Sequence, residues 1–512
     1  MRQPVANLAR LLFDTARLHP NRIGLSHGTD QWRWGELCAR AEGLAAALAA
    51  RGLTKGDRIL VHSRNSPAMV EAMWAVLALG AVWVPTNNRL TPPEVTYLAD
   101  ASGAKFFLCD ERFPDHAAAL KALDQVEING KEWQEWATSG ACFKPAAMLY
   151  DDPAWFFFTS GTTGRSKAAV LTHGQMAFVV NNHLADLFPG LSLDVSALIV
   201  APLSHAAGLH MLAHTARGVR TVLTQSESLD PAEVWRLIET ERVATLFTVP
   251  TLLKRLVEHP AVDHHDKSSL SAVLYAGAPM YRADQRLAYE KLGNALVQYY
   301  GLGEVTSNIT LLPGWMHAEV LAGDEAGAGP CGYPRTGMEI AILEPDGTRL
   351  PEGAIGEICV RGPAVFAGYH NNPEANAKAF RGGWFHTGDL GFLDARGLLT
   401  ITGRESDMYI SGGSNVYPRE TEELLMAHPA VLEAAVVGVP DPEWGEIGIA
   451  AIVLRAGCSA SEVELSAHLE GRLARYKRPR RFVFWAELPK SGYGKIPKNL
   501  IRDKLRADGV ID

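Results

Sequence analysis

The residues best suited to chemistry lie in one loop, where an apolar strand runs into a cluster of small polar residues. Between Trp155 and His173 the sequence reads WFFFTSGTTGRSKAAVLTH. Glycines let backbone N–H groups approach phosphate oxygens, while hydroxyl groups and a lysine add hydrogen bonds and positive charge. A solvated hairpin turn is the alternative, but an ordinary turn needs fewer hydroxyls. We expect a polyphosphate to be bound by Thr159, Ser160, Gly161, Thr162, Thr163, Gly164 and Lys167.

The loop differs from the nucleotide-binding loop of P-loop proteins. That loop requires glycine directly before its lysine and serine or threonine directly after it. Here Ser166 precedes Lys167 and Ala168 follows it. A P-loop kinase or GTPase is therefore disfavoured.

The loop instead resembles the signature loop of the adenylate-forming superfamily, which comprises acyl-CoA synthetases, adenylation domains and firefly-type luciferases. Further motifs of that superfamily follow in the same order across nearly the whole chain, which argues against an accidental resemblance. They are AGAP at 276–279, QYYGLGE at 298–304, WFHTGDLG at 384–391, GRESDMYISGGSNVYPRE at 403–420 and PKSGYGKIPKN at 489–499.

The resemblance implies a nucleotide site with a magnesium ion. Glu304 matches the acid that binds Mg²⁺, a hard oxygen ligand of the kind this ion prefers. Asp389 matches the carboxylate that accepts hydrogen bonds from the ribose hydroxyls, with Arg404 assisting; an isolated TGD segment would more often be a turn. The residues implied on the adenine side are Gly277, Ala278, Pro279, Tyr300 and Gly301.

Lys495 lies in a glycine-flanked loop near the C-terminus and would be a surface lysine on its own evidence. The resemblance makes it the catalytic lysine, which contacts the substrate carboxylate and the α-phosphate. It would stabilise the charge that develops as the acid's oxygen attacks phosphorus and pyrophosphate departs.

A second half-reaction is implied, in which the coenzyme A thiol attacks the acyl carbonyl and AMP leaves. The family rotates its small domain between the two steps. Gly412 and Gly413 match the segment that then lines the pantetheine passage, where absent side chains permit close approach. Ser406 matches the hinge, a position that absorbs backbone rotation.

Four positions depart from the common pattern of the family. Ser166 and Ala168 replace proline and glycine, which changes the stiffness of the loop more than its donors. Gly303 replaces threonine, and the missing hydroxyl would remove a hydrogen bond to a charged group, worth roughly 1.5–3 kcal/mol. Ser406 replaces the usual aspartate or lysine of the hinge.

Two side chains are expected at the acyl pocket. Tyr299 occupies a position that is often small where long tails pass, so it favours a shorter, branched or ring-containing acid. His205 matches the histidine of the pocket gate and is counted among the catalytic residues; a core histidine is the alternative. No aspartate replaces it to hold an ammonium group, which disfavours an amino acid substrate.

The surrounding elements indicate how these motifs are positioned. Helical and extended patterns alternate between residues 35 and 109, with Ser66 and Thr91–Glu94 as helix-start signals, which predicts an α/β fold with a mostly parallel sheet. Residues 332–368 contain turns and short extended pieces. With the resemblance, we expect an N-terminal domain over 1–403, made of two α/β sheet subdomains and a small β-barrel-like subdomain. A hinge at 404–407 and a small mobile α+β domain over 408–512 would follow.

Composition is that of a protein without a nucleic-acid partner. The net charge is −8, and the six cysteines have no metal-ligand spacing, which fits a reducing cytoplasm. The basic run at 472–481 fits a solvated helix end better than a coenzyme A site. The longest apolar run, roughly 72–85, is too short to span a bilayer and contains Gly80, so neither a transmembrane segment nor a signal peptide is expected.

These observations favour an ATP-dependent acid:CoA ligase that acts on a medium-sized aliphatic, alicyclic or aryl acid. ATP, Mg²⁺ and coenzyme A are the expected cofactors, and a monomer or homodimer is the expected assembly. One alternative is an adenylation enzyme that loads a carrier protein, although no carrier domain is appended. The other is a nucleotide-binding protein with impaired catalysis, which Gly303 and Ser406 suggest and the retained Lys167, Glu304 and Lys495 oppose.

Overall fold

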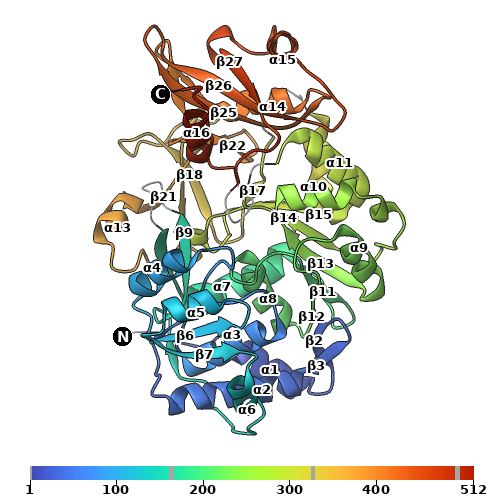
Figure 1. The fold of residues 1–512 in the computed structure, drawn as a ribbon, viewed down its shortest axis with the longest axis vertical. Helices are drawn as coiled ribbons and strands as arrows, with labels where there is room; N and C mark the ends of the chain where they lie inside the picture. Colours follow the sequence, from blue (N-terminus) through green and yellow to red (C-terminus); the bar gives the residue numbers. More distant parts are fainter. Residues whose placement is uncertain (1–2, 161–165, 279, 324–328, 491–495, 512) are drawn as a thin grey trace.

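The computed structural model describes residues 3–160, 166–278, 280–323, 329–490 and 496–511. Within these residues the chain forms four larger sheets and one two-stranded pair, β1 (Pro4–Val5) with β8 (Met148–Leu149). Figure 1 shows the N-terminal sheets at one end of the molecule and the C-terminal elements at the other. The expected α/β fold, with a large N-terminal part and a small C-terminal part, is confirmed.

The first large sheet is mostly parallel, and helices alternate with its strands along the chain. Its strands are β4 (Arg58–His62), β5 (Val82–Pro85), β6 (Phe106–Asp110), β7 (Asp124–Ile128), β9 (Pro153–Ser160) and β10 (Ser166–Thr172). β10 folds back antiparallel on β9, so the proposed phosphate loop joins two paired strands. The associated helices are α1 (Arg10–Leu18), α2 (Trp34–Ala50), α3 (Pro67–Leu79), α4 (Pro92–Ser102), α5 (Pro114–Ala119), α6 (Lys131–Ala137) and α7 (His173–Asn182).

Local signals fix where two of these helices begin. The Ser66 hydroxyl accepts a hydrogen bond from the Met69 backbone N–H at the start of α3, and Gly80 ends the helix with a left-handed φ of 75°. Thr91 and Glu94 form the expected capping box of α4. Nearly every residue of α3 is buried, which explains its continuous apolar character.

The second large sheet of the described residues has nine strands. Its strands are β2 (Ile23–His27), β3 (Asp30–Arg33), β11 (Ser196–Ile199), β12 (Arg220–Leu223), β13 (Val243–Thr248), β14 (Ala272–Tyr275), β15 (Leu296–Tyr300), β16 (Thr310–Leu312) and β17 (Tyr333–Pro334). The neighbouring strands from β2 to β15 run parallel, so their carboxyl ends meet along one edge. The helices are α8 (Ala206–Ala216), α9 (Pro231–Thr240), α10 (Pro250–Glu258), α11 (Arg282–Leu292) and α12 (Gly314–Ala322), with a π-helix at His183–Leu187.

The β-rich region expected near residues 332–368 extends further and forms an antiparallel sheet. It contains β18 (Glu339–Leu343), β19 (Gly356–Arg361), β20 (Phe380–Arg381), β21 (Trp384–Leu393) and β22 (Leu399–Arg404), with α13 (Pro373–Ala379) beside it. The long β21 pairs with β19, β20 and β22. The segment that resembles the ribose-binding motif therefore lies in the middle of this sheet.

The C-terminal elements form a separate sheet with helices. They are β23 (Tyr409–Ser411), β24 (Ser414–Val416), α14 (Pro418–Met426), β25 (Val431–Asp441), β26 (Gly445–Leu454), α15 (Glu462–Leu469), β27 (Arg481–Phe484) and α16 (Lys498–Ala507). α15 ends at Leu469, because Glu470 takes an extended conformation, and Gly471 follows in a left-handed conformation with φ of 76° that favours glycine.

The hydrophobic cores follow the sheets. One large cluster spans both N-terminal α/β sheets, which fixes them against each other, and the C-terminal sheet has a cluster on each face. All six cysteines are unpaired. No described helix has the length and apolar character required to cross a bilayer.

Candidate functional site

A cleft of about 1480 Å³ opens among the two N-terminal α/β sheets and the antiparallel sheet. It is the feature that brings the distant motifs together. The predicted site residues that line it are Thr159, Lys167, His205, Gly277, Tyr299, Gly301, Glu304, Arg404 and Ser406. Gly161, Thr162, Thr163, Gly164, Pro279 and Lys495 fall outside the described residues.

Glu304 lies at the centre of this cleft, in a single 3₁₀ turn after β15. Its side chain is mostly buried, and its Oε1 accepts hydrogen bonds from the Thr159 hydroxyl at 2.7 Å and the Tyr369 hydroxyl at 3.0 Å. Both hydroxyls donate to Oε1, so these two contacts leave the lone pairs of Oε2 unused. The carboxylate therefore fits a cation ligand beside the phosphate loop.

Tyr369 is a functional candidate that the sequence reasoning missed. Besides donating to Glu304, its ring lies 5.3 Å from the ammonium nitrogen of Lys167, which is cation–π distance. Burial and the neighbouring Glu304 raise the pKa of the Tyr369 hydroxyl, which therefore stays protonated and remains a donor. Tyr369 thus connects the lysine of the loop with the acid opposite it.

Tyr300, Asp389 and Arg404 form a second group behind the cleft wall. The Tyr300 hydroxyl donates to Asp389 Oδ2 at 2.5 Å, and Arg404 Nε lies 2.8 Å from Asp389 Oδ1. Burial first, and then Asp389, raises the pKa of Tyr300. A carboxylate has about four acceptor positions, so Asp389 retains capacity for two further donors such as sugar hydroxyls.

The structure explains why position 303 holds glycine and not threonine, which the sequence alone does not explain. A Cβ atom at this position would lie 2.5 Å from Phe157 Cδ1 and 2.9 Å from Thr159 Cγ2. The Phe157 ring also contacts the His205 ring, with centroids 4.4 Å apart. The space that a threonine would occupy is therefore filled by Phe157, and Gly303 is matched to its neighbours.

Two stacked aromatic rings form part of the wall of the cleft. Tyr299 and Phe247 have ring centroids 5.9 Å apart at an interplanar angle of 25°, and both line the cleft. Phe247 also lines a water-sized cavity on its other side. The Tyr299 hydroxyl lies 3.2 Å from His210 Nε2, which holds the ring in place. Together these rings form an end wall between the cleft and the interior.

Behind this end wall lies a buried basic cluster that the sequence did not indicate. It consists of His183, His210, His214 and Arg335, with Asp186 as the ionic partner of Arg335 at 3.3 Å. Burial lowers the pKa of Arg335 only to about 10, so it stays charged at neutral pH. Burial also lowers the pKa of His214 to about 3 and those of His183 and His210 well below the usual value, with Arg335 contributing to both.

These histidines predict a loss of stability in mild acid. Above pH ~6.5 these histidines are neutral in both the folded and the unfolded protein. Below that pH the unfolded chain binds protons and the folded protein does not, so the free energy of unfolding decreases until the pKa of the folded state is reached. Relative to neutral pH, each histidine lowers the free energy of unfolding by about 2 kcal/mol at pH 5. Urea midpoints at pH 7.5 and 5 should show this fall, and His214→Leu should make it shallower. The exposed His264 is the control, because His264→Gln should leave the slope unchanged.

The C-terminal sheet contacts the cleft side of the N-terminal part through a few polar residues. The Tyr281 hydroxyl donates to the Ala434 carbonyl at 3.2 Å, and the Arg282 backbone N–H donates to Glu423 at 3.2 Å. Within the C-terminal part itself, Lys498 at the start of α16 pairs with Glu422 of α14. Gly412 and Gly413 lie in the turn between β23 and β24, where Gly412 packs on the Trp444 ring, and neither lines the cleft.

Comparison with known proteins places this arrangement. The family model described as AMP-binding enzyme matches residues 12–370, and the one described as AMP-binding enzyme C-terminal domain matches residues 420–495. A feruloyl-CoA synthase of an Amycolatopsis species is 38% identical, covering 96% of this chain and 97% of that protein. The chain belongs to the AMP-binding enzyme family.

Solved structures agree with this membership. ATP-bound MatB from Rhodopseudomonas palustris has a TM-score of 0.87 and 32% identity, covering 99% of both chains. O-succinylbenzoate coenzyme A synthetase from Bacillus subtilis, in complex with ATP and a magnesium ion, has a TM-score of 0.85 and 31% identity, covering 98% of this chain and 100% of that chain. These relatives confirm the expected class, an AMP-forming acyl-CoA synthetase that uses ATP, Mg²⁺ and coenzyme A.

In this AMP-binding enzyme the cleft unites groups that fit such a reaction. Lys167, Thr159 and Glu304 line it together, and the Thr159 hydroxyl donates to Glu304. Arg404 lines the cleft and pairs with Asp389 behind it. His205 and the end wall occupy the side where an acyl group would extend.

Proposed function

We propose that this enzyme joins a compact, medium-sized carboxylic acid, ring-containing or branched, to coenzyme A. The observation that carries the proposal is the end wall of Tyr299 and Phe247, which closes the cleft beside His205. A flat ring would pack against these stacked aromatics, whereas a long linear tail would meet them end-on. A relative named feruloyl-CoA synthase supports an aryl acid.

The reaction would proceed in two steps. The carboxylate oxygen forms a bond to the α-phosphorus of ATP as the bond to pyrophosphate breaks; the thiol sulfur of coenzyme A then bonds to the acyl carbon as AMP leaves. Lys167 and Thr159 bind and orient the phosphates, Asp389 and Arg404 orient the ribose, and Lys495 stabilises charge at the reacting phosphate. Glu304 would hold Mg²⁺, which neutralises charge on the leaving group.

A change of domain orientation would separate the two steps. We place the hinge at residues 404–407 and centre it on Ser406, which lies at the cleft edge directly after β22. The polar contacts that Tyr281 and Arg282 make with the C-terminal domain would break during this motion, and Gly412 and Gly413 would then approach the thiol passage. The six unpaired cysteines support a reducing cytoplasm as its compartment.

One assay separates this function from the alternatives. Pyrophosphate release is measured over a panel of aryl, alicyclic, branched and linear acids, with and without coenzyme A, and the products are identified by mass spectrometry. Thioester formed with free coenzyme A supports the ligase. Adenylate without thioester would indicate a carrier-protein acceptor, and ATP binding without turnover would indicate a non-catalytic protein.

Opening the end wall should change which acids are accepted. Because Tyr299→Ala removes a ring that stops the acyl chain, it is expected to raise kcat/KM for long linear acids about tenfold and to lower it for compact acids. Tyr299→Phe is the matched control, since it keeps the ring and loses only the hydroxyl that contacts His210. An unchanged acid profile in the alanine variant would show that the acyl group extends elsewhere.

A further inference from the structure

The segment Thr387–Asp389 bulges away from the neighbouring strand β19. Between β19 and β21, Cys359 faces His386 and Glu357 faces Leu390, so two residues advance on β19 while four advance on β21. The extra residues leave the β19 ladder, although Asp389 stays paired with Arg404 on β22, and Gly388 takes a positive φ of 72°. Such bulges beside active sites redirect a side chain, and here the redirected side chain is Asp389.

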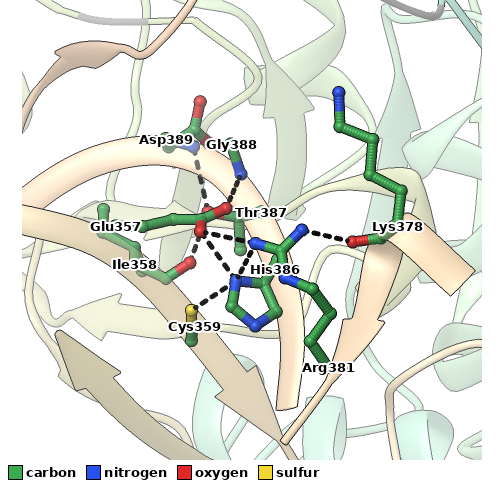
Figure 2. Close-up of polar contacts among 9 residues, drawn as sticks. All are labelled: Glu357, Ile358, Cys359, Lys378, Arg381, His386, Thr387, Gly388 and Asp389. Atoms are coloured by element: carbon green, nitrogen blue, oxygen red, sulfur yellow. Dashed lines mark hydrogen bonds and ion pairs between the residues drawn. The ribbon is translucent and has the colours of Figure 1, made fainter. Parts of the chain in front are cut away.

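Side chains satisfy the backbone groups that the bulge takes out of the ladder. The Gly388 N–H donates to Glu357 Oε1 at 3.1 Å, and the Asp389 N–H donates to the Thr387 hydroxyl at 3.1 Å. The same Thr387 hydroxyl donates to the Ile358 carbonyl at 2.6 Å. Figure 2 shows the Glu357 carboxylate reaching from β19 to the peptide of Gly388.

The other oxygen of Glu357 is held by two basic side chains. His386 Nδ1 lies 2.6 Å from Oε2 and Arg381 Nη2 lies 3.4 Å from it (Figure 2). Glu357, Cys359 and His386 also have the ligand types of a metal site, with their ligand atoms within 4.8 Å of one another. Arg381 Nη2, however, lies 2.9 Å from the same His386 nitrogen, so a cationic group already occupies this place. The cluster therefore restrains the carboxylate from the side opposite the bulge.

We propose that Glu357 is a positioning residue, which sets the position of Asp389 for the ribose hydroxyls through the Gly388 peptide. Asp389 is only 4% exposed and is engaged by Tyr300 and Arg404 at short distances. A small shift of its backbone breaks these contacts and moves the carboxylate off the sugar. The inference rests on the proposed role of Asp389 in binding the nucleotide, and it adds Glu357, at the cleft wall, as a residue that acts through Asp389.

Three variants of Glu357 separate the effect of side-chain length from the effect of charge. Glu357→Gln keeps an oxygen at the same distance from the Gly388 N–H, so its KM for ATP should stay within about threefold of wild type. Glu357→Asp keeps the charge but is one methylene shorter and no longer reaches Gly388. It and Glu357→Ala are expected to raise KM for ATP about tenfold, while KM for the acid is unchanged.

A deoxynucleotide tests whether the effect passes through the ribose. With 2′,3′-dideoxy-ATP, which lacks both hydroxyls, wild type and Glu357→Asp should have the same kcat/KM, because the contact that Glu357 positions is already missing. Glu339→Ala is the control: this carboxylate lies in the same sheet, pairs with Arg361 at 2.7 Å, and is remote from the bulge. Its KM for ATP should match wild type.

The outcomes distinguish the two levels of the proposal. Equal losses for Glu357→Asp with ATP and with the dideoxynucleotide, or equal rises in KM for ATP and for the acid, would overturn the positioning role. Failure of Glu357→Gln to retain wild-type KM in a protein with wild-type thermal stability would also overturn it. If wild type itself does not prefer ATP over the dideoxynucleotide, the ribose role of Asp389 fails, and the positioning role fails with it.

Discussion

Lys495→Ala is expected to lower adenylate formation by about 100- to 1,000-fold, the effect of removing one group that stabilises transition-state charge. Thioester formation from a supplied acyl-adenylate should stay largely intact, because the lysine has no task once pyrophosphate has left. Pyrophosphate release measures the first step, and single-turnover reaction of synthetic acyl-adenylate with coenzyme A measures the second.

A lysine from the same region provides the control. Lys490 pairs with Glu433 at 2.6 Å on the surface of the C-terminal sheet, and Lys490→Ala should leave both half-reactions at wild-type rates. Equal losses of the two half-reactions in Lys495→Ala would contradict the assignment of this residue to adenylation alone.

Glu304→Gln is expected to lower pyrophosphate release at least about 100-fold and to raise the Mg²⁺ concentration needed for half-maximal rate. Loss of groups that only support a metal ligand already costs about 10- to 100-fold, and this substitution removes the charge of the ligand itself. The amide keeps the size of the side chain and one oxygen to accept from Thr159 and Tyr369, so the fold should persist. Initial rates over a Mg²⁺ titration give both quantities.

Tyr369→Phe controls for the hydrogen bonds of Glu304. It removes the hydroxyl that donates to Oε1 at 3.0 Å but leaves the carboxylate and its charge. Its Mg²⁺ dependence should stay close to wild type, with a loss of rate below about tenfold. A Mg²⁺ dependence unchanged in Glu304→Gln would remove Glu304 from the metal site.

Local signals made parts of the fold predictable from the sequence. Ser66 begins α3 and the Thr91–Glu94 capping box begins α4, because helix caps act over a few residues. Glu304, Asp389 and Arg404 were chosen from motif resemblance, and the structure places them in or beside one cleft. Their roles in catalysis remain predictions.

Other parts depend on contacts between segments far apart in the chain. Nothing near Tyr369 indicates that it faces Glu304, sixty-five residues earlier, and nothing near Gly303 reveals that Phe157 fills its space. Glu357 lies in an ordinary strand pattern, and only its register with β21 gives it a partner at Gly388.

The contact between Asp389 and Arg404 connects the proposed nucleotide binding with the proposed change of domain orientation. These residues are cross-strand neighbours on β21 and β22, and Arg404 is the first residue of the hinge proposed at 404–407. A ligand that binds Asp389 therefore weakens or strengthens the contact of Asp389 with Arg404, from which the mobile C-terminal domain follows. By thermodynamic reciprocity, a nucleotide that shifts the orientation of the C-terminal domain must have its own affinity shifted by the same factor. A nucleotide whose ribose binds Asp389 would then act on domain orientation as well as serving as reactant or product.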